Sequence, residues 1–316
     1  MKSFIITEND ANQRLDKFLK KLLPNAALSL IYKLNRKNCI KINRKREDNE
    51  YKLQIDDSVE IYLKDEEYAA LSTKKAEIRS DNPSSQSLDP KDIVYEDSEL
   101  LIINKNAGTI VHPGDFKTKE LSLISQVHDY LGNKLSSLTF KPSLIHRIDK
   151  DTSGIIMIAK TKRSLDAMLV ELQENRIDKI YLAVCLGTPT EPIGTIKKKL
   201  LRLEEAIHTN KITIDEVAGQ KAITHYQTLK TDIQGKYSLV ECRLETGRMH
   251  QIRIHMASIG CSVLGDDTYG NKKENAFAKR EYGVARQLLH AHRVSFLHPT
   301  KKVRVTFIAR LKEDME

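Results

Sequence analysis

The sequence of 316 residues has little of what would place it in a membrane or outside the cell. No apolar run approaches the roughly 18 residues that a membrane-spanning helix needs. The N-terminus MKSFIITENDANQRLDKF carries acidic residues where a secretion signal has an apolar segment. Its 4 cysteines are scattered without a C-x-x-C pair, which argues against a zinc ribbon, and a disulfide framework is unusual at this length. We therefore expect a cytoplasmic protein with reduced cysteines and no membrane segment.

Motifs for nucleotides and metals are missing as well. There is no G-x-x-x-x-G-K-[ST] loop for a nucleotide phosphate. His250 and His255, in HQIRIH, are spaced differently from the pair in H-E-x-x-H and lie in what reads as a strand. The segment HRID at 146–149 begins like a protein-kinase catalytic loop, but Ile148 separates the arginine from the aspartate and no glycine-rich loop precedes it. The sequence thus predicts no metal, no nucleotide and no other cofactor.

Basic charge is concentrated near the N-terminus. The chain has a formal net charge of +9, and residues 1–64 hold 14 basic and 9 acidic residues. From Lys33 to Arg46 there are seven basic residues and no acid. Such a run is usually a solvated helix face, but solvated faces tend to include acids, so we favour a surface that contacts the phosphates of a polyanionic partner. The expected phosphate-binding residues are Lys33, Arg36, Lys37, Lys41, Arg44, Lys45 and Arg46.

A polar segment divides the chain into two parts. STKKAEIRSDNPSSQSLDP, at 72–90, is rich in serine and short of large apolar residues, which is typical of a linker. We expect a first domain at 1–72, a flexible linker at 73–90 and a second domain at 91–316. The first domain should contain a helix whose apolar face is Leu15, Phe18, Leu19, Leu22 and Leu23, a second helix capped by Ser29, and strands at 41–43 and 59–64.

The second part has the pattern of an α+β domain. DIVYEDSELLIINK reads as a strand, an acidic turn and another strand, and helical stretches are expected at 119–131 and 162–175. Short strands alternate with turns through the rest of the segment to residue 270. This predicts a large, mostly antiparallel mixed sheet. The segment 196–215 has charges of both signs and is expected to be an exposed hairpin or an insertion.

The segment HRIDKDTSG, at 146–154, directly precedes the apolar run IIMIAKT, which reads as a buried strand. Its aspartate, Asp149, has two interpretations. It can cap a turn together with Thr152 and Ser153, the more frequent role of such a residue. It can also be a catalytic carboxylate held beside a rigid element. The residues alone leave both interpretations open.

The sequence also resembles two known families. NQRLDKFL at 12–19, SLIYKLNRKNCIKIN at 29–43 and the following RKR resemble the alpha-L RNA-binding domain of a small-subunit ribosomal protein and of tyrosyl-tRNA synthetases. HRIDKDTSGIIMIAKT resembles the signature of the RluA-type pseudouridine synthases, HRLD-x-x-TSG followed by an apolar strand. Further segments resemble other blocks of that family in the right order, namely INKNAGTIVHPG (103–114), DKIYLAVCLG (178–187), LETGRMHQIRIHMASIGCSVLGDDTYG (244–270) and LLHAHRVSFLHP (288–299).

The second resemblance covers residues 92–310 and is greatest to the RluC/RluD branch, with a layout closer to RluC. It implies an isomerase that breaks the bond between ribose C1′ and uracil N1, turns the base and rejoins it through C5. It also implies large-subunit (23S) ribosomal RNA as the partner, no cofactor and a pseudouridine-synthase-like catalytic domain. We expect a monomer, because the RNA supplies the partner surface. A non-catalytic ribosome-assembly factor and a tRNA-directed member of the family remain as alternatives.

The resemblance assigns roles to the reactive residues. It makes Asp149 the catalytic carboxylate, although attack at C1′, addition to C6 and loss of the C2′ proton all remain open routes. Arg253 would be its ion-pair partner, and Tyr181 would stack on the uracil and help remove the C5 proton. Arg147 matches the residue that fills the space left by a flipped base. We expect structural support of the site from His146, Thr152, Gly154, Gly247 and Arg248.

Local patterns add expectations about these positions. Ile252 and Ile254 flank Arg253, and this alternation predicts a strand with Gln251 and Arg253 on one face. The two glycines are expected to serve tight turns. Departures from the family pattern are Asn106 in place of proline, Met249 in place of threonine or serine, and Ile148 in place of leucine, and none of them removes a reactive group.

Overall fold

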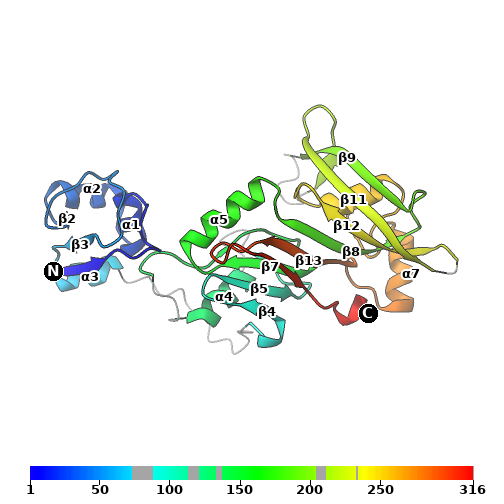
Figure 1. Ribbon diagram of the computed structural model, residues 1–316, viewed down its shortest axis with the longest axis horizontal. Helices are drawn as coiled ribbons and strands as arrows, with labels where there is room; N and C mark the ends of the chain where they lie inside the picture. Colours follow the sequence, from blue (N-terminus) through cyan, green and yellow to red (C-terminus); the bar gives the residue numbers. More distant parts are fainter. Residues whose placement is uncertain (73–87, 113–120, 133–136, 204–210, 233, 316) are drawn as a thin grey trace.

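The computed structural model describes residues 1–72, 88–112, 121–132, 137–203, 211–232 and 234–315, so most of the expected linker lies outside the described residues. Figure 1 shows an elongated molecule in which the first 72 residues form a separate unit at one end. This N-terminal unit contains, in chain order, β1 (Lys2–Ile5), α1 (Leu15–Leu22), α2 (Leu28–Arg36), β2 (Ile40–Ile42), β3 (Ser58–Ile61) and α3 (Asp65–Ser72).

The N-terminal unit has its own apolar core. Its three strands form an antiparallel sheet in the order β1-β3-β2. Leu15, Phe18 and Leu19 of α1 are fully buried, as their helical spacing predicted. The expected N-cap of α2 is wrong, because α2 follows Ala27, makes no side-chain cap hydrogen bond, and contains Ser29 in its first turn.

Within the described residues, eleven strands of the second part form one mixed sheet, which confirms the predicted α+β architecture. Its main path is β10-β9-β11-β12-β8-β13-β7-β5-β4, with β14 paired to β13 and β6 paired to β7. Only β13 and β7 are parallel among these pairs. The strands are β4 (Ile93–Glu96), β5 (Leu100–Lys105), β6 (Ser143–Leu144), β7 (Ser153–Ala159), β8 (Asp178–Leu186), β9 (Ile193–Arg202), β10 (Ile212–Ile214), β11 (Gln220–Thr231), β12 (Tyr237–Leu244), β13 (Leu289–Leu297) and β14 (Arg304–Ile308).

Strand β7 is buried on both faces, which explains its uninterrupted apolar sequence. Ile155 and Met157 belong to one core cluster, which includes Met168 of α5 (Lys162–Gln173). Ile156 and Ile158 belong to the opposite cluster with α4 (Leu123–Leu131). Successive side chains of a strand point to opposite faces, so β7 fixes both layers and holds the loop before it in place.

Gly154 is needed for close packing of two strands. It lies within β7 opposite Ala291 of the parallel strand β13 and has a φ of +107°. A Cβ atom at this position would be 2.3 Å from the Ala291 carbonyl oxygen. The expectation of a tight turn at Gly154 is therefore wrong, since the requirement comes from the neighbouring backbone and from positive φ.

The helices bear out some expectations and correct others. Helices α4 and α5 fall within the two predicted helical stretches. The segment after residue 250 is a helix, α6 (Gln251–Ser258), and not the expected strand. The remaining helices are α7 (Lys272–Tyr282) and the short 3-10 turns η1 (Pro90–Asp92) and η4 (Glu313–Met315). No helix within the described ranges is long and apolar enough to cross a membrane.

The segment 196–215 contains two antiparallel strands, as in a hairpin. In this pair β10 lies next to β9, with Ile212 opposite Arg202 and Ile214 opposite Leu200. Residues 204–210, which connect the two strands, lie outside the described residues.

A buried polar contact joins the N-terminal unit to the sheet domain. Asp10 is fully buried, and its carboxylate accepts hydrogen bonds from Ser137 Oγ (3.0 Å), Leu138 N (3.1 Å), Thr139 N (2.9 Å) and Thr139 Oγ1 (2.7 Å). These four donors lie more than 120 residues away in the sequence. The N-terminal unit is thus docked onto the sheet domain by a carboxylate that accepts four hydrogen bonds from residues 137–139 of that domain.

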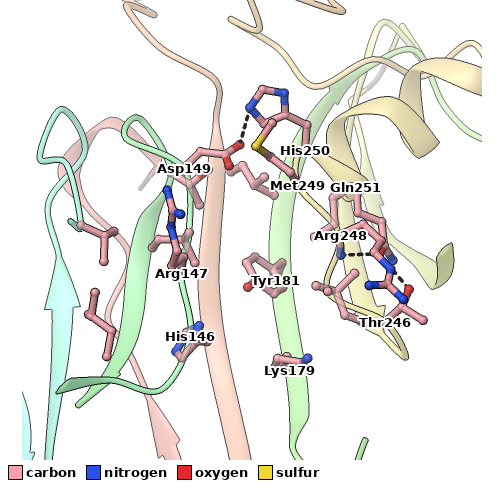
Figure 2. A pocket seen from close by; sticks show the side chains of 18 of the residues that line it. His146, Arg147, Asp149, Lys179, Tyr181, Thr246, Arg248, Met249, His250 and Gln251 are labelled. Atoms are coloured by element: carbon pink, nitrogen blue, oxygen red, sulfur yellow. Dashed lines mark hydrogen bonds and ion pairs between the residues drawn. The ribbon is translucent and has the colours of Figure 1, made fainter. Parts of the chain in front are cut away.

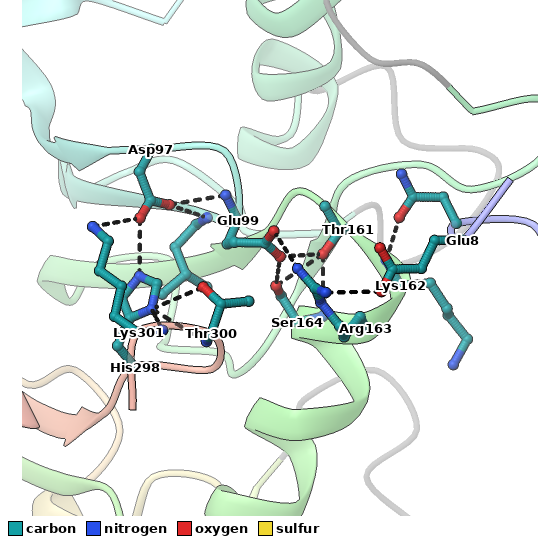
Figure 3. Close-up of polar contacts among 12 residues, drawn as sticks. Glu8, Asp97, Glu99, Thr161, Lys162, Arg163, Ser164, His298, Thr300 and Lys301 are labelled. Carbon is teal, nitrogen blue, oxygen red and sulfur yellow. Dashed lines mark hydrogen bonds and ion pairs between the residues drawn. The ribbon is translucent and has the colours of Figure 1, made fainter. Parts of the chain in front are cut away.

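A second set of contacts lies at the start of α5 (Figure 3). Arg163 donates hydrogen bonds to Glu8 (2.8 Å) and to Glu99 (2.9 Å), and so links the N-terminal unit to the β4–β5 turn. Asn9 Oδ1 accepts a hydrogen bond from the backbone N–H of Lys162 (3.1 Å), which is one of the unpaired donors of the first helical turn.

Candidate active site

A cavity of about 1180 Å³ opens between the loop that precedes β7 and the turn that leads from β12 into α6. Figure 2 shows side chains from both segments and from β8 pointing into it. The cavity brings together eight of the residues expected at the site: His146, Arg147, Asp149, Thr152, Tyr181, Gly247, Arg248 and Arg253. Gly154 is not among the lining residues and acts through strand packing.

Asp149 lies in the loop that enters β7, and neighbouring groups fix this loop. The backbone N–H of Thr152 donates to the Asp149 carbonyl (3.2 Å), and Gln287 Nε2 donates to Thr152 Oγ1 (3.1 Å). The buried Lys105 ammonium donates to the carbonyl oxygens of Lys150 (2.7 Å), Asn106 (2.8 Å) and Thr109 (3.0 Å). These bonds tie the loop after β5 to the loop after Asp149, while burial lowers the pKa of Lys105 to about 7.

Arg253 pairs with Asp149. Its Nη1 donates to Asp149 Oδ2 at 3.0 Å, and the residue is only 5% exposed. Its other side binds Asp266 in a two-point contact, with Nε to Oδ2 at 2.7 Å and Nη2 to Oδ1 at 2.8 Å. One arginine therefore joins two carboxylates, of which Asp149 faces the cavity and Asp266 lies behind it.

The pKa values of this cluster follow from burial and charge. Burial opposes the charged form of Arg253, but Asp266 and Asp149 outweigh it and raise the pKa of the guanidinium. Burial would raise the pKa of Asp266, but the Arg253 hydrogen bonds and charge lower it overall. Backbone N–H groups of Thr268 (2.9 Å) and Tyr269 (3.0 Å) also donate to Asp266. All these groups favour a charged, rigid Arg253.

The helical position of Arg253 corrects the strand expectation. Residues 251 to 256 are all buried, so α6 has no polar face whose period would reveal a helix. Gln251 anchors its first turn: its Nε2 donates to Ile223 O (2.9 Å), and its Oε1 accepts from Arg248 N (3.0 Å) and Thr246 Oγ1 (2.8 Å). The helix thereby directs Arg253 towards Asp149.

His250 is a cavity residue that the sequence did not indicate. It has a positive φ of 55° immediately before α6, and its Nε2 lies 3.9 Å from Asp149 Oδ2. Its Nδ1 is 2.9 Å from the hydroxyl of Tyr269. Burial lowers the pKa of His250, and the nearby Asp149 charge opposes this only in part. We therefore describe His250 as a neutral side chain beside the carboxylate.

Tyr181 comes from the middle of β8, on the face that lines the cavity. The side chain is 7% exposed, and Figure 2 shows it below Asp149. Burial, with a contribution from the Asp149 charge, raises the pKa of the phenol, so the hydroxyl is protonated at neutral pH. An aromatic ring in this place offers a flat apolar surface to a planar ligand.

His146 and Arg147 precede Asp149 and differ in environment. His146 Nε2 accepts a hydrogen bond from the backbone N–H of Met157 (3.1 Å), and burial lowers the pKa of His146 to about 3. It is thus a neutral side chain that holds the loop against β7, in line with the structural support expected of it. Arg147 is exposed at the rim of the cavity, where it is accessible to a large ligand.

Gly247 and Arg248 lie on the other side of the cavity. Gly247 has no positive φ, so the expectation that a tight turn requires a glycine at this position is wrong. A Cβ atom on Gly247 would lie 3.6 Å from Lys179 Nζ, an ordinary contact distance. Arg248 is exposed, and its Nε donates to Lys221 O (3.2 Å), which fixes the base of the turn.

The seven basic residues predicted to contact phosphates lie in the N-terminal unit and not in the cavity. Lys33 and Arg36 belong to α2, Lys41 to β2, and the remainder follow those elements. All are exposed except Lys41, which is half-buried with its Nζ 5.2 Å from the centre of the Tyr62 ring. These seven residues are called the basic surface below: Lys33, Arg36, Lys37, Lys41, Arg44, Lys45 and Arg46.

Four residues in or next to the cavity were not assigned to the site from the sequence: Lys105, Lys179, His250 and Asp266. Asp266 had the clearest signal, because GDDTYG contains two adjacent acids between glycines. Its contact with Arg253 nevertheless depends on the tertiary structure and could not be predicted from the spacing of residues in the sequence.

Comparisons with known proteins show the family to which the chain belongs. The model of the family described as RNA pseudouridylate synthase matches residues 99–258. Ribosomal large subunit pseudouridine synthase C of Buchnera aphidicola subsp. Baizongia pistaciae is 34% identical over 317 residues, covering 97% of this chain and 92% of the relative. The protein of the same name from Vibrio cholerae is 32% identical over 319 residues, covering 98% and 93%.

Another relative and a solved structure extend the likeness. Ribosomal large subunit pseudouridine synthase D of Zymomonas mobilis is 37% identical over 233 residues, covering 72% of this chain and 71% of the relative. The structure of Human RNA Pseudouridylate Synthase Domain Containing 1 has a TM-score of 0.57 at 24% identity, covering 71% of this chain and 85% of that chain. It shares the fold. The chain belongs to the RNA pseudouridine synthase family, whose members are isomerases that convert uridine in RNA to pseudouridine.

Proposed function

We propose that this protein isomerises specific uridines of large-subunit (23S) ribosomal RNA to pseudouridine, with Asp149 as the catalytic carboxylate. The observation that carries the proposal is the Asp149 side chain, 23% exposed to the cavity and bound by Arg253 at 3.0 Å. A charged hydrogen bond at this distance fixes the orientation of the carboxylate at the edge of the cavity. An ionised carboxylate is what attack at C1′, addition to C6 or removal of the C2′ proton would each require.

Arg253 positions the carboxylate in this proposal. Its two bonds to Asp266 hold the guanidinium plane, so that Nη1 presents a fixed donor to Asp149 Oδ2. A carboxylate held by a rigid partner keeps the geometry that the reaction needs, since small misplacements of a reacting group cost large factors in rate.

In this proposal Tyr181 contacts the flipped base, and Arg147 fills the space that the base leaves in the RNA. A uridine in folded RNA must be flipped out of its stack, at a cost of a few kcal/mol. We propose that the Tyr181 ring stacks on the uracil and that its hydroxyl assists loss of the C5 proton. Arg147, exposed at the rim, would enter the vacated position in the RNA.

The N-terminal unit adds affinity for RNA. Its basic surface contains six exposed cations, which suits contact with phosphates and carries little sequence information. We further propose that the protein acts in the cytoplasm. We also propose that it acts as a monomer, since the RNA covers the cavity and the basic surface in the working complex.

The choice of substrate is tested with RNA labelled with tritium at uracil C5. The purified protein is mixed with an unmodified large-subunit ribosomal RNA transcript or with unmodified transfer RNA, and tritium released to water is counted. We expect release from the ribosomal transcript alone. Release from transfer RNA alone would contradict the proposed substrate, and release from neither RNA would favour a non-catalytic RNA-binding factor.

A further inference from the structure

Lys179 is a buried lysine of the cavity with no partner among the residues that the structure describes. It lies near the start of β8, is 8% exposed, and makes no hydrogen bond or ion pair across the ranges that the structure describes. Lysine is rarely buried to this extent unless it is paired. Burial of an unpaired ammonium costs free energy, and here it lowers the pKa of Lys179. A ligand that supplies an acceptor would remove this cost.

The acidic groups near Lys179 are engaged elsewhere. Asp178, its neighbour in β8, points to the opposite face of the sheet, where Arg243 (2.6 Å) and Arg304 bind it. Asp149 is the acidic residue among those that line the cavity, and its Oδ2 is bound by Arg253. Among the described residues, no acidic acceptor is therefore left for Lys179, and a bound ligand can supply one.

The position of Lys179 relative to Tyr181 indicates what that acceptor is. The two residues are separated by one residue in β8, so both side chains point to the same face of the sheet. Their partners on the neighbouring strand β12 are Leu244 for Lys179 and Cys242 for Tyr181. Figure 2 shows Tyr181 between Asp149 and Lys179. A nucleoside whose ribose lies at Asp149 and whose base covers the Tyr181 ring would direct the far edge of the base towards Lys179.

The depth of Lys179 distinguishes a base from a phosphate. Arg147 and Arg248 are exposed at the rim, where a nucleic-acid backbone arrives first. Lys179 is only 8% exposed, so its side chain lies deeper than those of the two arginines. Uracil has carbonyl oxygens at C2 and C4, which accept hydrogen bonds from an ammonium.

We propose that Lys179 donates a hydrogen bond to a carbonyl oxygen of the bound uracil and stabilises the negative charge that develops on the base. This inference rests on the proposed function and adds a catalytic residue to it. A fixed cation acts most strongly in a cavity from which water is excluded, because it need not reorganise during the reaction.

The chemistry balances without any further reactant. When the C1′–N1 bond breaks, its electron pair stays on the uracil, and the charge spreads over N1, O2 and O4. Addition of a carboxylate at C6 would likewise place negative charge on O4. The C1′–C5 bond then forms with an electron pair of the base, C5 loses its proton, and N1 gains one. Lys179 keeps its own protons throughout, so its role is the same for each route open to Asp149.

The test compares Lys179→Met with Lys179→Arg and with Lys197→Met, which removes an exposed lysine of β9. Tritium release is measured in a single turnover with saturating enzyme, and RNA affinity is measured separately. We expect Lys179→Met to slow release by about 100-fold to 1000-fold, the usual effect of removing one donor to a developing anion. Affinity should change by less than about threefold, and Lys179→Arg should retain more activity than Lys179→Met.

Two further measurements separate catalysis from structure. Thermal unfolding of Lys179→Met should occur at or above the wild-type temperature, because the variant removes an unpaired buried charge. In the wild type the rate should fall at alkaline pH below the ordinary lysine range, since burial lowers the pKa of Lys179, and this fall should be absent from Lys179→Met. A variant that unfolds well below the wild type would show a structural lysine and overturn the inference.

Other results also decide the matter. A wild-type rate for Lys179→Met would remove Lys179 from the reaction. A weaker affinity with an unchanged saturating rate would assign Lys179 to an RNA phosphate. If the wild type does not isomerise ribosomal RNA, only the proposed substrate is contradicted. The variants of Lys179 are then compared on the RNA that the wild type does isomerise.

Discussion

Replacement of Arg253 by methionine should damage both stability and catalysis. Arg253 is 5% exposed, and its guanidinium joins Asp149 to Asp266, which is 1% exposed. Methionine fills part of the space but leaves the buried Asp266 without its cation. Removal of one member of a buried ion pair costs about 3–5 kcal/mol. Asp266 retains the backbone donors of Thr268 and Tyr269, so we expect a loss near the lower end, about 3 kcal/mol.

A matched control is Arg243→Met, which removes an exposed arginine from Asp178 while Arg304 still contacts that carboxylate. Exposed pairs contribute about 1 kcal/mol or less. The free energy of unfolding is measured in urea for the wild type and both variants. Single-turnover tritium release should fall by about 100-fold or more for Arg253→Met, because Asp149 loses its fixed donor. Equal losses of stability in the two variants, or an unchanged rate for Arg253→Met, would refute this reasoning.

Four further predictions follow from the structure. Tyr181→Phe should bind RNA normally but slow tritium release by about 100-fold, the usual effect of losing a proton-transfer group; a wild-type rate would leave the ring with stacking alone. Asp10→Ala removes the four hydrogen bonds from residues 137–139, so the radius of gyration from small-angle scattering should increase. The control Asp65→Ala changes an exposed carboxylate and should leave the radius unchanged. An unchanged radius for both variants would show that Asp10 does not hold the units together. Replacing Lys33, Arg36 and Lys37 together by glutamine should reduce the slope of log affinity against log salt by about 2, and an unchanged slope would exclude phosphate contacts there. Burial lowers the pKa of His146 to about 3 and those of His255 and His290 to about 4, so the unfolded chain takes up protons below about pH 6.5 that the folded protein does not. The free energy of unfolding in urea should therefore fall between pH 6.5 and pH 4, and His146→Gln should make that fall shallower; the same slope in both proteins would contradict a neutral His146.

The apolar strand β7 and the position of Asp149 next to it could be predicted from the sequence because their signals are local. Strand β7 is buried on both faces, and its uninterrupted apolar run predicted this directly. The position of Asp149 beside that strand followed from their adjacency in the chain. Tyr181 was placed correctly on a strand because the surrounding β8 residues are apolar and β-branched or aromatic at several positions.

Other features depend on contacts that no local pattern encodes. Helix α6 was expected to be a strand, since residues 251 to 256 are all buried and polar and apolar side chains alternate along them. The role of Asp266 depends on the path of the chain between α6 and α7. The docking of the N-terminal unit through Asp10 joins residues separated by more than 120 positions, and no sequence periodicity reports such a contact.

The proposed function depends above all on Asp149 as the group that performs the isomerisation, and a comparison of two neighbouring aspartates tests this role. Asp149→Ala and Asp151→Ala are assayed for tritium release from C5-labelled large-subunit ribosomal RNA and for RNA binding. We expect Asp149→Ala to bind RNA but to release no tritium, while Asp151→Ala remains active. Tritium release by Asp149→Ala at the rate of Asp151→Ala would contradict a catalytic role for Asp149.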